Sequence, residues 1–448
     1  MNACVAIVTR ILVLVWSWDR FPPAGDGVFF HRFAERLAAG EGYTVRWPDN
    51  VVTYAAHYPI GYPAILSGAY RVFGPSAHWA GVVNAAAFLV MSTVLFEVLC
   101  KRLHPHRALM VSCAFSLFPG LLFYTPAVMT ETLASCLLFV AAAILVRADE
   151  REGKIASSAA TPVLLAGGVL GMATLVRPQA ILFALGVAVF SLPWARRAEA
   201  LRRSIAVVGV AVLVCLPWTA RNCVRMKDCS LVSVNAGWNL LIGTQTENGS
   251  WRGVGVPERC KSVWDEAEKD RCFRKEASLA IAEHPWTWLS KMPQKWAVTF
   301  DHFGAAGWYL EASNSTVFTK ADRSRLDIAE IGFARLCLLA AVFGVFREKK
   351  RSLRADPWVF AMFALAVLSV FLRHAWVAYA LMSMMALRSK LPWTRISGGA
   401  ILLTMFLHGV FFGAGRYGLS IAPFVVVLAA ISYERSARAE PMNENPEA

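Results

Sequence analysis

The stretch WAGVVNAAAFLVMSTVLFEVLCKRLHPHR, residues 79–107, joins a long apolar block to a short basic connector. The block 79–100 is long enough to cross a bilayer, which takes about 20 apolar residues as a helix. A cluster of Lys and Arg directly after such a block is typical of a connector on the cytoplasmic side. This two-part pattern recurs along the chain, and it predicts an all-α polytopic membrane protein.

Apolar residues make up 56% of the 448 residues, above the roughly 45–50% of an ordinary soluble domain. The first apolar block lacks the basic start and the small-residue cleavage site of a signal peptide, so we expect it to span the membrane as well. Twelve blocks approach spanning length, at 3–18, 79–100, 108–124, 130–147, 161–176, 179–194, 204–218, 327–346, 357–372, 374–388, 396–412 and 418–432.

The distribution of positive charge gives these blocks an orientation. With the N-terminus on the cytoplasmic side, every inner connector carries several Lys or Arg: KRLHPHR, RADEREGK, ARRAEALRR, REKKRSLRAD, RSKLPWTR and the C-terminal YERSARAE. This bias predicts about twelve transmembrane helices with both chain ends in the cytoplasm. It also explains much of the net charge of +14 without a nucleic-acid partner.

The outer face then receives two long segments, 19–78 and 219–326, and residues 433–448 form a cytoplasmic tail. We treat 1–448 as a single membrane domain without internal repeats. Function concentrates in long ordered loops. The larger segment is also expected to contain short helices, such as one over 276–298.

Four of the ten cysteines, Cys223, Cys229, Cys260 and Cys272, lie in the larger outer segment. An oxidising outer compartment favours disulfides, and we predict the pairs Cys223–Cys229 and Cys260–Cys272. Free thiols remain an alternative, because the sequence does not fix connectivity.

The first outer segment opens with FPPAGDGVFFHRFAERLAAGEGY, residues 21–43. Its apolar side chains recur at i, i+4 and i+8, which predicts an amphipathic surface helix over 27–39 that ends at Gly40. This stripe consists of Phe29, Phe33 and Leu37. Asp26 stands at the N-cap position, where it caps the helix or serves as a general base at the water–lipid boundary, and the two roles are compatible.

Two further outer positions carry titratable groups. His57 lies in an aromatic turn with Tyr58 and Tyr62, where a histidine is either structural or a contact for an anion or a metal. Glu131 starts an apolar block after a short outer turn, which is an ordinary helix start or a site residue facing Asp26.

Three arginines, Arg177, Arg221 and Arg416, lie at predicted outer helix ends. Each either snorkels to the interface or binds phosphate through forked hydrogen bonds. Gly413 and Gly415 would let a ligand approach Arg416, and Arg373 with His374 is a weaker candidate. Aromatic residues nearby suit sugar rings and interfacial lipid equally: Trp238, Trp251, Trp308 and Tyr417.

Around His57 the sequence shows none of the metal-binding patterns HxH, HExxH or paired CxxC. A tightly held structural metal therefore has no support. A single divalent cation at Asp26 and Glu131 stays open, and no other cofactor is implied.

Several motifs in order along the chain carry a family resemblance: HYPIGYPAIL (57–66), TPAVMTETLASCLLF (125–139), LGMATLVRPQAILF (170–183), LPWTARNCVRMKDCSLVSVNAGWNLLIGT (216–244) and GRYGLSIAPFVVVLAA (415–430). Together with the Asp26–Tyr43 stretch they resemble the C-type integral-membrane glycosyltransferases (GT-C). That superfamily includes bacterial lipopolysaccharide sugar transferases, aminoarabinose transferases and protein O-mannosyltransferases. The resemblance covers nearly the whole chain.

The resemblance implies a polyprenyl-phosphate-linked sugar donor that is used outside the cytoplasm. It matches Asp26 to the catalytic aspartate of the first outer loop and Glu131 to the acidic residue of the second. Arg177 matches the arginine of an RP motif, and Arg416 that of a late RY motif. Many relatives carry a paired acidic motif where this chain has Gly27 after Asp26, which weakens the case for a metal.

The predicted function is transfer of a sugar from such a donor to a cell-envelope lipid, glycan or protein, with inversion and with Asp26 as general base. The predicted location is a bacterial inner membrane. Site residues are sorted by role: catalytic, Asp26 and Glu131; donor phosphate, Arg416, Arg177, His57 and Arg221; sugar or acceptor, Tyr58, Tyr62, Trp238 and Tyr417.

Two other functions remain open. An oligosaccharide ligase or polymerase of the envelope would share the lipid-linked donor. A polytopic lipid or solute transporter would fit the helix count, but transporters usually show two related halves. A purely structural membrane protein would leave a carboxylate and several arginines on one face unexplained.

Overall fold

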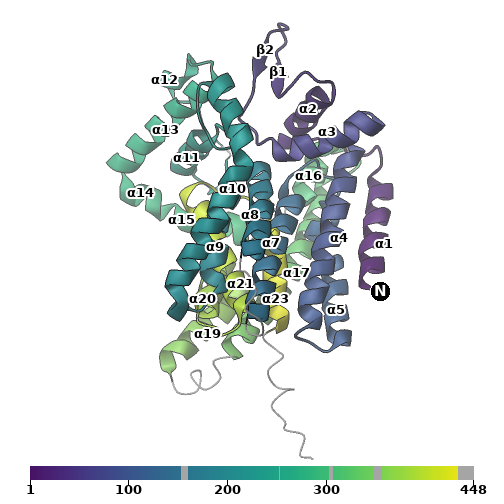
Figure 1. The fold of residues 1–448 in the computed structure, drawn as a ribbon, viewed down its shortest axis with the longest axis vertical. Helices are drawn as coiled ribbons and strands as arrows, with labels where there is room; N and C mark the ends of the chain where they lie inside the picture. The colour runs from purple at the N-terminus through teal and green to yellow at the C-terminus, as the bar shows by residue number, and fades with distance from the viewer. Residues whose placement is uncertain (153–159, 252, 302–305, 348–355, 432–448) are drawn as a thin grey trace, which may run out of the picture.

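The computed structural model describes residues 1–448 apart from 153–159, 252, 302–305, 348–355 and 432–448. The described chain is nearly all helical, as predicted, with one short antiparallel hairpin in addition. Long helices stand side by side as a bundle, and the elements of the two predicted outer segments gather at its upper end (Figure 1). The predicted tail 433–448 lies outside the described residues.

The bundle helices are α1 (Asn2–Ser17), α4 (His78–Cys100), α5 (Pro105–Ser116), α6 (Pro119–Phe123), α7 (Glu131–Glu152), α8 (Ala160–Val176), α9 (Ala180–Ser191), α10 (Arg197–Met226), α17 (Lys320–Arg347), α19 (Pro357–Phe371), α20 (Ala375–Leu387), α21 (Pro392–Val410) and α23 (Ala422–Ile431). Each of the twelve predicted apolar blocks therefore contains a helix. The block 108–124 is divided between α5 and α6, because Pro119 disfavours helical geometry at the residue before it.

Four helices in the described parts of the chain are long and apolar enough to cross a membrane: α4, the first 18 residues of α7, α10 with the 3-10 turn before it, and α17. These spans make the protein an integral membrane protein. The remaining apolar helices are shorter, so the number twelve stays a prediction. Helix α7 is the most enclosed of the four, with 72% of its apolar window buried against 33% for α10.

The first outer segment contains α2 (Asp26–Ala38), β1 (Thr44–Arg46), β2 (Val52–Tyr54) and α3 (Gly61–Phe73). Helix α2 is the predicted surface helix, and Gly40, with a φ of +77°, follows its end as expected. Helix α3 begins at Gly61, within the predicted aromatic turn, whereas His57 and Tyr58 precede the helix as expected. Its proline lies in the first turn, where the missing N–H costs nothing.

Two details of α2 differ from prediction. The N-cap is Gly25, whose φ of 56° suits glycine, and Asp26 is the first helical residue without a side-chain capping bond. The buried face runs through Phe30, Phe33 and Ala34, whereas Phe29 is exposed and stacks on Tyr58 at 4.9 Å. The face shifts because α2 packs on α3.

The second outer segment contains α11 (Ala236–Gln245), α12 (Glu258–Lys261), α13 (Glu266–Glu283), α14 (Pro285–Ser290), α15 (Met292–Phe300) and α16 (Ala306–Ser313), and α22 (Gly415–Gly418) follows α21. The helix predicted over 276–298 is divided among α13, α14 and α15. Pro285 and Pro293 lie in the first turns of α14 and α15, since proline interrupts a continuing helix.

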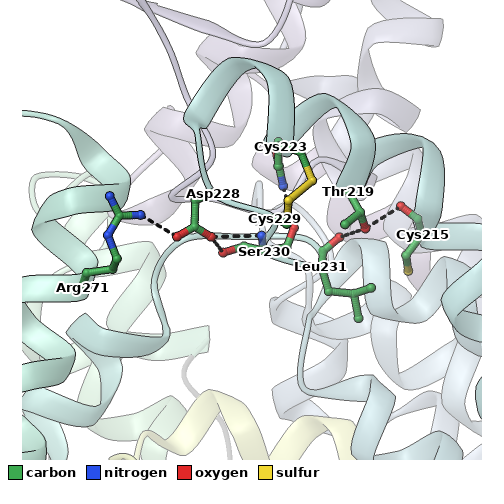
Figure 2. Close-up of a disulfide and its surroundings, with 9 residues drawn as sticks. Cys215, Thr219, Cys223, Asp228, Cys229, Ser230, Leu231 and Arg271 are labelled. Atoms are coloured by element: carbon green, nitrogen blue, oxygen red, sulfur yellow. Dashed lines mark hydrogen bonds and ion pairs between the residues drawn. A yellow bond between two sulfur atoms is a disulfide. The ribbon is translucent and has the colours of Figure 1, made fainter.

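Both predicted disulfides are present in the structure. Cys223, near the end of α10, joins Cys229 across a short loop (Figure 2). In the same loop the Asp228 carboxylate accepts hydrogen bonds from Ser230 and from Arg271 on α13, the latter at 2.7 Å. The loop therefore ties α10 to α13.

Cys260–Cys272 links α12 to α13, and its loss is expected to destabilise this segment. Closing a loop of this length is worth about 3 kcal/mol in chain entropy. Cys260→Ala/Cys272→Ala should therefore raise the rate of proteolysis within 250–283 under native conditions. The control is Cys113→Ala, because Cys113 on α5 is a free cysteine. Equal proteolysis of both variants would contradict the prediction.

Candidate active site

Four side chains form an alternating row of charges where the outer segments meet the bundle. Arg416 Nη2 lies 2.8 Å from Asp26 Oδ2, and Arg416 Nε lies 3.5 Å from Glu131 Oε1. Arg177 Nη1 lies 2.8 Å from the same Glu131 oxygen. The predicted convergence of Asp26 and Glu131 therefore occurs, through Arg416 between them.

Each member of this row is placed by the start or end of a helix. Asp26 opens α2 and Glu131 opens α7, the most enclosed span. Arg177 directly follows α8, which stops ahead of Pro178 as expected for the residue before a proline. Arg416 lies on the short helix α22. Four segments distant in sequence thus meet at a single point.

Gly413 serves this geometry in a different way from that predicted. A Cβ at this position would lie 2.1 Å from the Lys295 carbonyl oxygen. The glycine therefore admits the backbone of α15 and not a ligand. This contact fixes the loop that carries Arg416.

Gly413→Ala is accordingly expected to destabilise the protein by about 1–3 kcal/mol, as overpacked substitutions do, and to displace Arg416. The thermal unfolding midpoint in detergent would fall. Gly332→Ala on α17, where nothing lies within 4 Å of the added Cβ, is the matched control. Equal unfolding midpoints for the two variants would contradict the prediction, because they would show that the loop accommodates the added methyl group without strain.

Two tyrosines and a threonine complete the row. Tyr58 donates a hydrogen bond to Asp26 Oδ1 at 3.2 Å, and Tyr124 donates to Glu131 Oε2 at 3.3 Å. Thr130 accepts from Arg177 at 3.3 Å. Tyr124 was not among the site residues predicted from the sequence. The one feature that could have identified it is its position seven residues before Glu131, because the turn between them brings the two side chains together.

Accessibility distinguishes the two carboxylates. The side chain of Glu131 is 1% exposed and that of Asp26 is 35% exposed. Burying charges is costly unless they are paired, and the two arginines supply partners for Glu131. Asp26 is the carboxylate that a ligand in solution can reach.

The electrostatic surroundings keep Asp26 ionised. Burial by itself would raise the pKa of Asp26, but the Arg416 guanidinium and the Tyr58 hydroxyl outweigh it and hold that pKa below its ordinary value. Burial would likewise lower the pKa of Arg416, and Asp26 and Glu131 raise it instead. The pair is therefore an ion pair at neutral pH.

Tyr417 lies against both arginines, with its ring centre 5.0 Å from the Arg177 guanidinium carbon and 5.3 Å from that of Arg416. Beside it is a small cavity of about 40 Å³. Arg177, Gln179 and Tyr417 line this cavity together with apolar side chains of α7, α9 and α21: Leu138, Phe183, Leu403 and Leu407. The Arg177 guanidinium and apolar side chains thus occur side by side.

The other predicted site residues lie apart from the row. His57 and Trp238 line a separate cavity near the first outer segment. Tyr62 is completely buried and donates to Asn84, which makes it a core residue. Arg221 donates to the backbone carbonyls of Tyr43 and Ala55, at 2.9 and 2.8 Å, and thereby supports the first outer segment.

The described residues contain no group of three or more His, Cys, Asp or Glu side chains that would hold a metal ion. Asp26 and Glu131, the two carboxylates considered for a divalent cation, both contact Arg416. In this arrangement a guanidinium lies between the two carboxylates, and the possible divalent cation stays a prediction.

The sequence matches no protein-family model and no curated protein. Solved structures do resemble the chain in fold. The oligosaccharyltransferase AglB from Archaeoglobus fulgidus, in complex with an inhibitory peptide and a dolichol-phosphate, aligns over 96% of this chain and 50% of its own, with 12% identity and a TM-score of 0.46.

ArnT from Cupriavidus metallidurans, bound to undecaprenyl phosphate, aligns over 96% of this chain and 77% of its own, with 13% identity and a TM-score of 0.41. The chain spans about half the length of the archaeal enzyme. The similarity to both structures is one of fold alone. At TM-scores below 0.5 it concerns the general arrangement of helices, and the site is interpreted from its own geometry.

Proposed function

We propose that the protein transfers a sugar from a polyprenyl-phosphate-linked donor to an acceptor of the cell envelope, on the extracytoplasmic face of a bacterial inner membrane. The observation that carries the proposal is the ion pair of an accessible carboxylate, Asp26, with Arg416 at the upper end of the membrane bundle. The ordered motifs along the sequence support it as well.

The chemistry is a single displacement at the anomeric carbon. The acceptor oxygen bonds to that carbon while Asp26 takes its proton. The bond from the anomeric carbon to the phosphate oxygen breaks, and the lipid phosphate leaves with the electron pair. One displacement inverts the anomeric centre, so no carboxylate nucleophile is needed and Glu131 orients the two arginines.

The leaving phosphate needs positive partners as its charge grows. Arg416 and Arg177 lie within reach of the same Glu131 oxygen, and each guanidinium has five N–H donors, of which the row uses only some. Apolar side chains of α7, α9 and α21 lie beside Arg177, where the first part of a lipid tail would approach. The donor would then enter from the bilayer between α7, α9 and α21.

The arrangement also gives an order to the reaction. Before donor binds, Arg416 holds Asp26 ionised but weakly basic. A donor phosphate that draws Arg416 toward itself would loosen this pair and make Asp26 a stronger base. Proton transfer from the acceptor is therefore favoured only after donor has bound.

The function is tested with purified protein in nanodiscs, a panel of radiolabelled polyprenyl-phosphate sugars and an envelope lipid extract. Release of free polyprenyl phosphate together with a labelled acceptor supports sugar transfer. Movement of intact donor across proteoliposomes, with no bond broken, would indicate a transporter. Transfer only from donors that carry a whole oligosaccharide would indicate a ligase or polymerase.

A further inference from the structure

A second cavity, of about 250 Å³, lies where the first outer segment meets α11 and α13. Pockets for drug-sized ligands measure about 300–1,000 Å³, so this cavity suits a group of about one ring. Its lining combines aromatic and aliphatic side chains with polar ones: Trp238, Phe273, Val234 and Val256, and His57, Glu266, Lys269 and Asp270.

The walls of the cavity are fixed by bonds between distant segments. Glu266 Oε2 accepts from the backbone N–H groups of Ala56 and His57, at 2.7 and 3.1 Å. Asp270 accepts from the N–H groups of Gly237 and Trp238, at 3.0 and 2.9 Å. The cavity therefore exists before any ligand arrives.

Close packing of α11 on α13 adds to this rigidity. A Cβ on Gly237 would lie 2.0 Å from the Asp270 carbonyl oxygen, so only glycine fits there. The Cys260–Cys272 disulfide holds the start of α13 to α12. Trp238 packs on Phe273 with ring centres 5.0 Å apart, which presents an aromatic surface to the cavity.

The polar lining is balanced in charge and has unused bonding capacity. Arg274 offsets Asp270 at 3.3 Å. In the described structure the His57 ring makes no hydrogen bond, and Lys269 only faces the Trp264 ring, at 5.5 Å. A phosphate in the cavity would be repelled by the Glu266 carboxylate. Hydroxyl groups both donate and accept hydrogen bonds, so they would pair with His57, Lys269 and Glu266.

The cavity also adjoins the candidate base. His57 lines it, and the His57 and Tyr58 rings lie 5.0 Å apart. Tyr58 in turn donates to Asp26 Oδ1 at 3.2 Å. A ring bound in the cavity would thus lie on one side of the His57 and Tyr58 side chains, with the Asp26 carboxylate on the other side.

We propose that this cavity binds an uncharged sugar ring of the acceptor, with its apolar face on Trp238 and its hydroxyls on His57, Lys269 and Glu266. The acceptor is then a glycan or a glycolipid headgroup and not a peptide. Its role as acceptor site rests on the proposed function, whereas binding of the ring does not.

The test is direct binding of methyl hexopyranosides to the full chain in phosphatidylcholine nanodiscs, measured by saturation-transfer difference NMR. Lys269→Ala and Trp238→Leu are each expected to raise the Kd about 10-fold, the effect of losing one anchoring contact of about 1.4 kcal/mol. Lys275→Ala, exposed on the same helix, and Trp286→Leu, 80% exposed on α14, should leave the Kd unchanged. Since Lys269 is partly exposed, its variant is expected to fold normally.

Absence of glycoside binding, binding that the cavity variants do not weaken, or binding of short peptides alone would each overturn the assignment. This result is separate from the fate of the proposed function, because glycoside binding and sugar transfer are measured independently. Cavity-dependent binding without any sugar transfer would leave the cavity assigned and the transfer reaction refuted. Transfer without glycoside binding would do the reverse.

Discussion

Asp26→Asn is expected to lower sugar transfer by at least about 100-fold without loss of donor binding. The amide cannot take a proton from the acceptor, and general acid–base catalysis is typically worth about 10²–10⁴-fold. Its oxygen can still accept from Tyr58 or Arg416, so the surrounding helices keep their contacts. Single-turnover rates with saturating labelled donor, in nanodiscs, measure the effect on the chemical step.

The matched control is Asp19→Asn. Asp19 is an exposed aspartate seven residues upstream that pairs with His78 at 3.1 Å and has no part in the charged row. Its variant should transfer at the wild-type rate. If Asp26→Asn did so too, Asp26 would only hold Arg416 in place and another group would have to take the proton.

The members of the charged row could be anticipated from the sequence, but their contacts could not. Positive-inside counting placed Asp26, Glu131, Arg177 and Arg416 on one face, and the ordered motifs singled out the same four. Neither source shows that Arg416 bridges both carboxylates, because that depends on how α2, α7 and α22 approach in space.

Two details that the sequence did not predict correctly, the buried face of α2 and the hairpin, have causes in their immediate surroundings. The stripe Phe29–Phe33–Leu37 satisfies helical spacing, yet α3 selects the neighbouring face of α2 because it packs there. Spacing alone cannot choose between two apolar faces that differ by one residue. Similarly, the hairpin Thr44–Tyr54 has strands of three residues, which are too short for an alternating pattern to be visible.

Arg416→Gln is expected to lower transfer by about 10²–10³-fold, the usual cost of removing one preorganised donor to a developing negative charge. It should also change the pH profile. Arg416 holds the pKa of Asp26 below its ordinary value of about 3.9, so wild-type activity falls only at lower pH, where the carboxylate becomes protonated. Without the guanidinium, burial raises that pKa and the acidic limb of the profile moves to higher pH.

Arg416→Lys separates charge from geometry. A lysine ammonium is a point charge and cannot present Nη2 to Asp26 and Nε to Glu131 at once. We expect the Arg416→Lys variant to return the acidic limb of the pH profile most of the way to its wild-type position, while the rate at neutral pH stays well below that of wild type. The control for charge removal is Arg259→Gln, because the Arg259 side chain on α12 is 81% exposed and lies outside the charged row. If Arg416→Gln lowered the rate but left the acidic limb in place, Asp26 would not be the group whose protonation state limits transfer, and the base would have to be sought elsewhere.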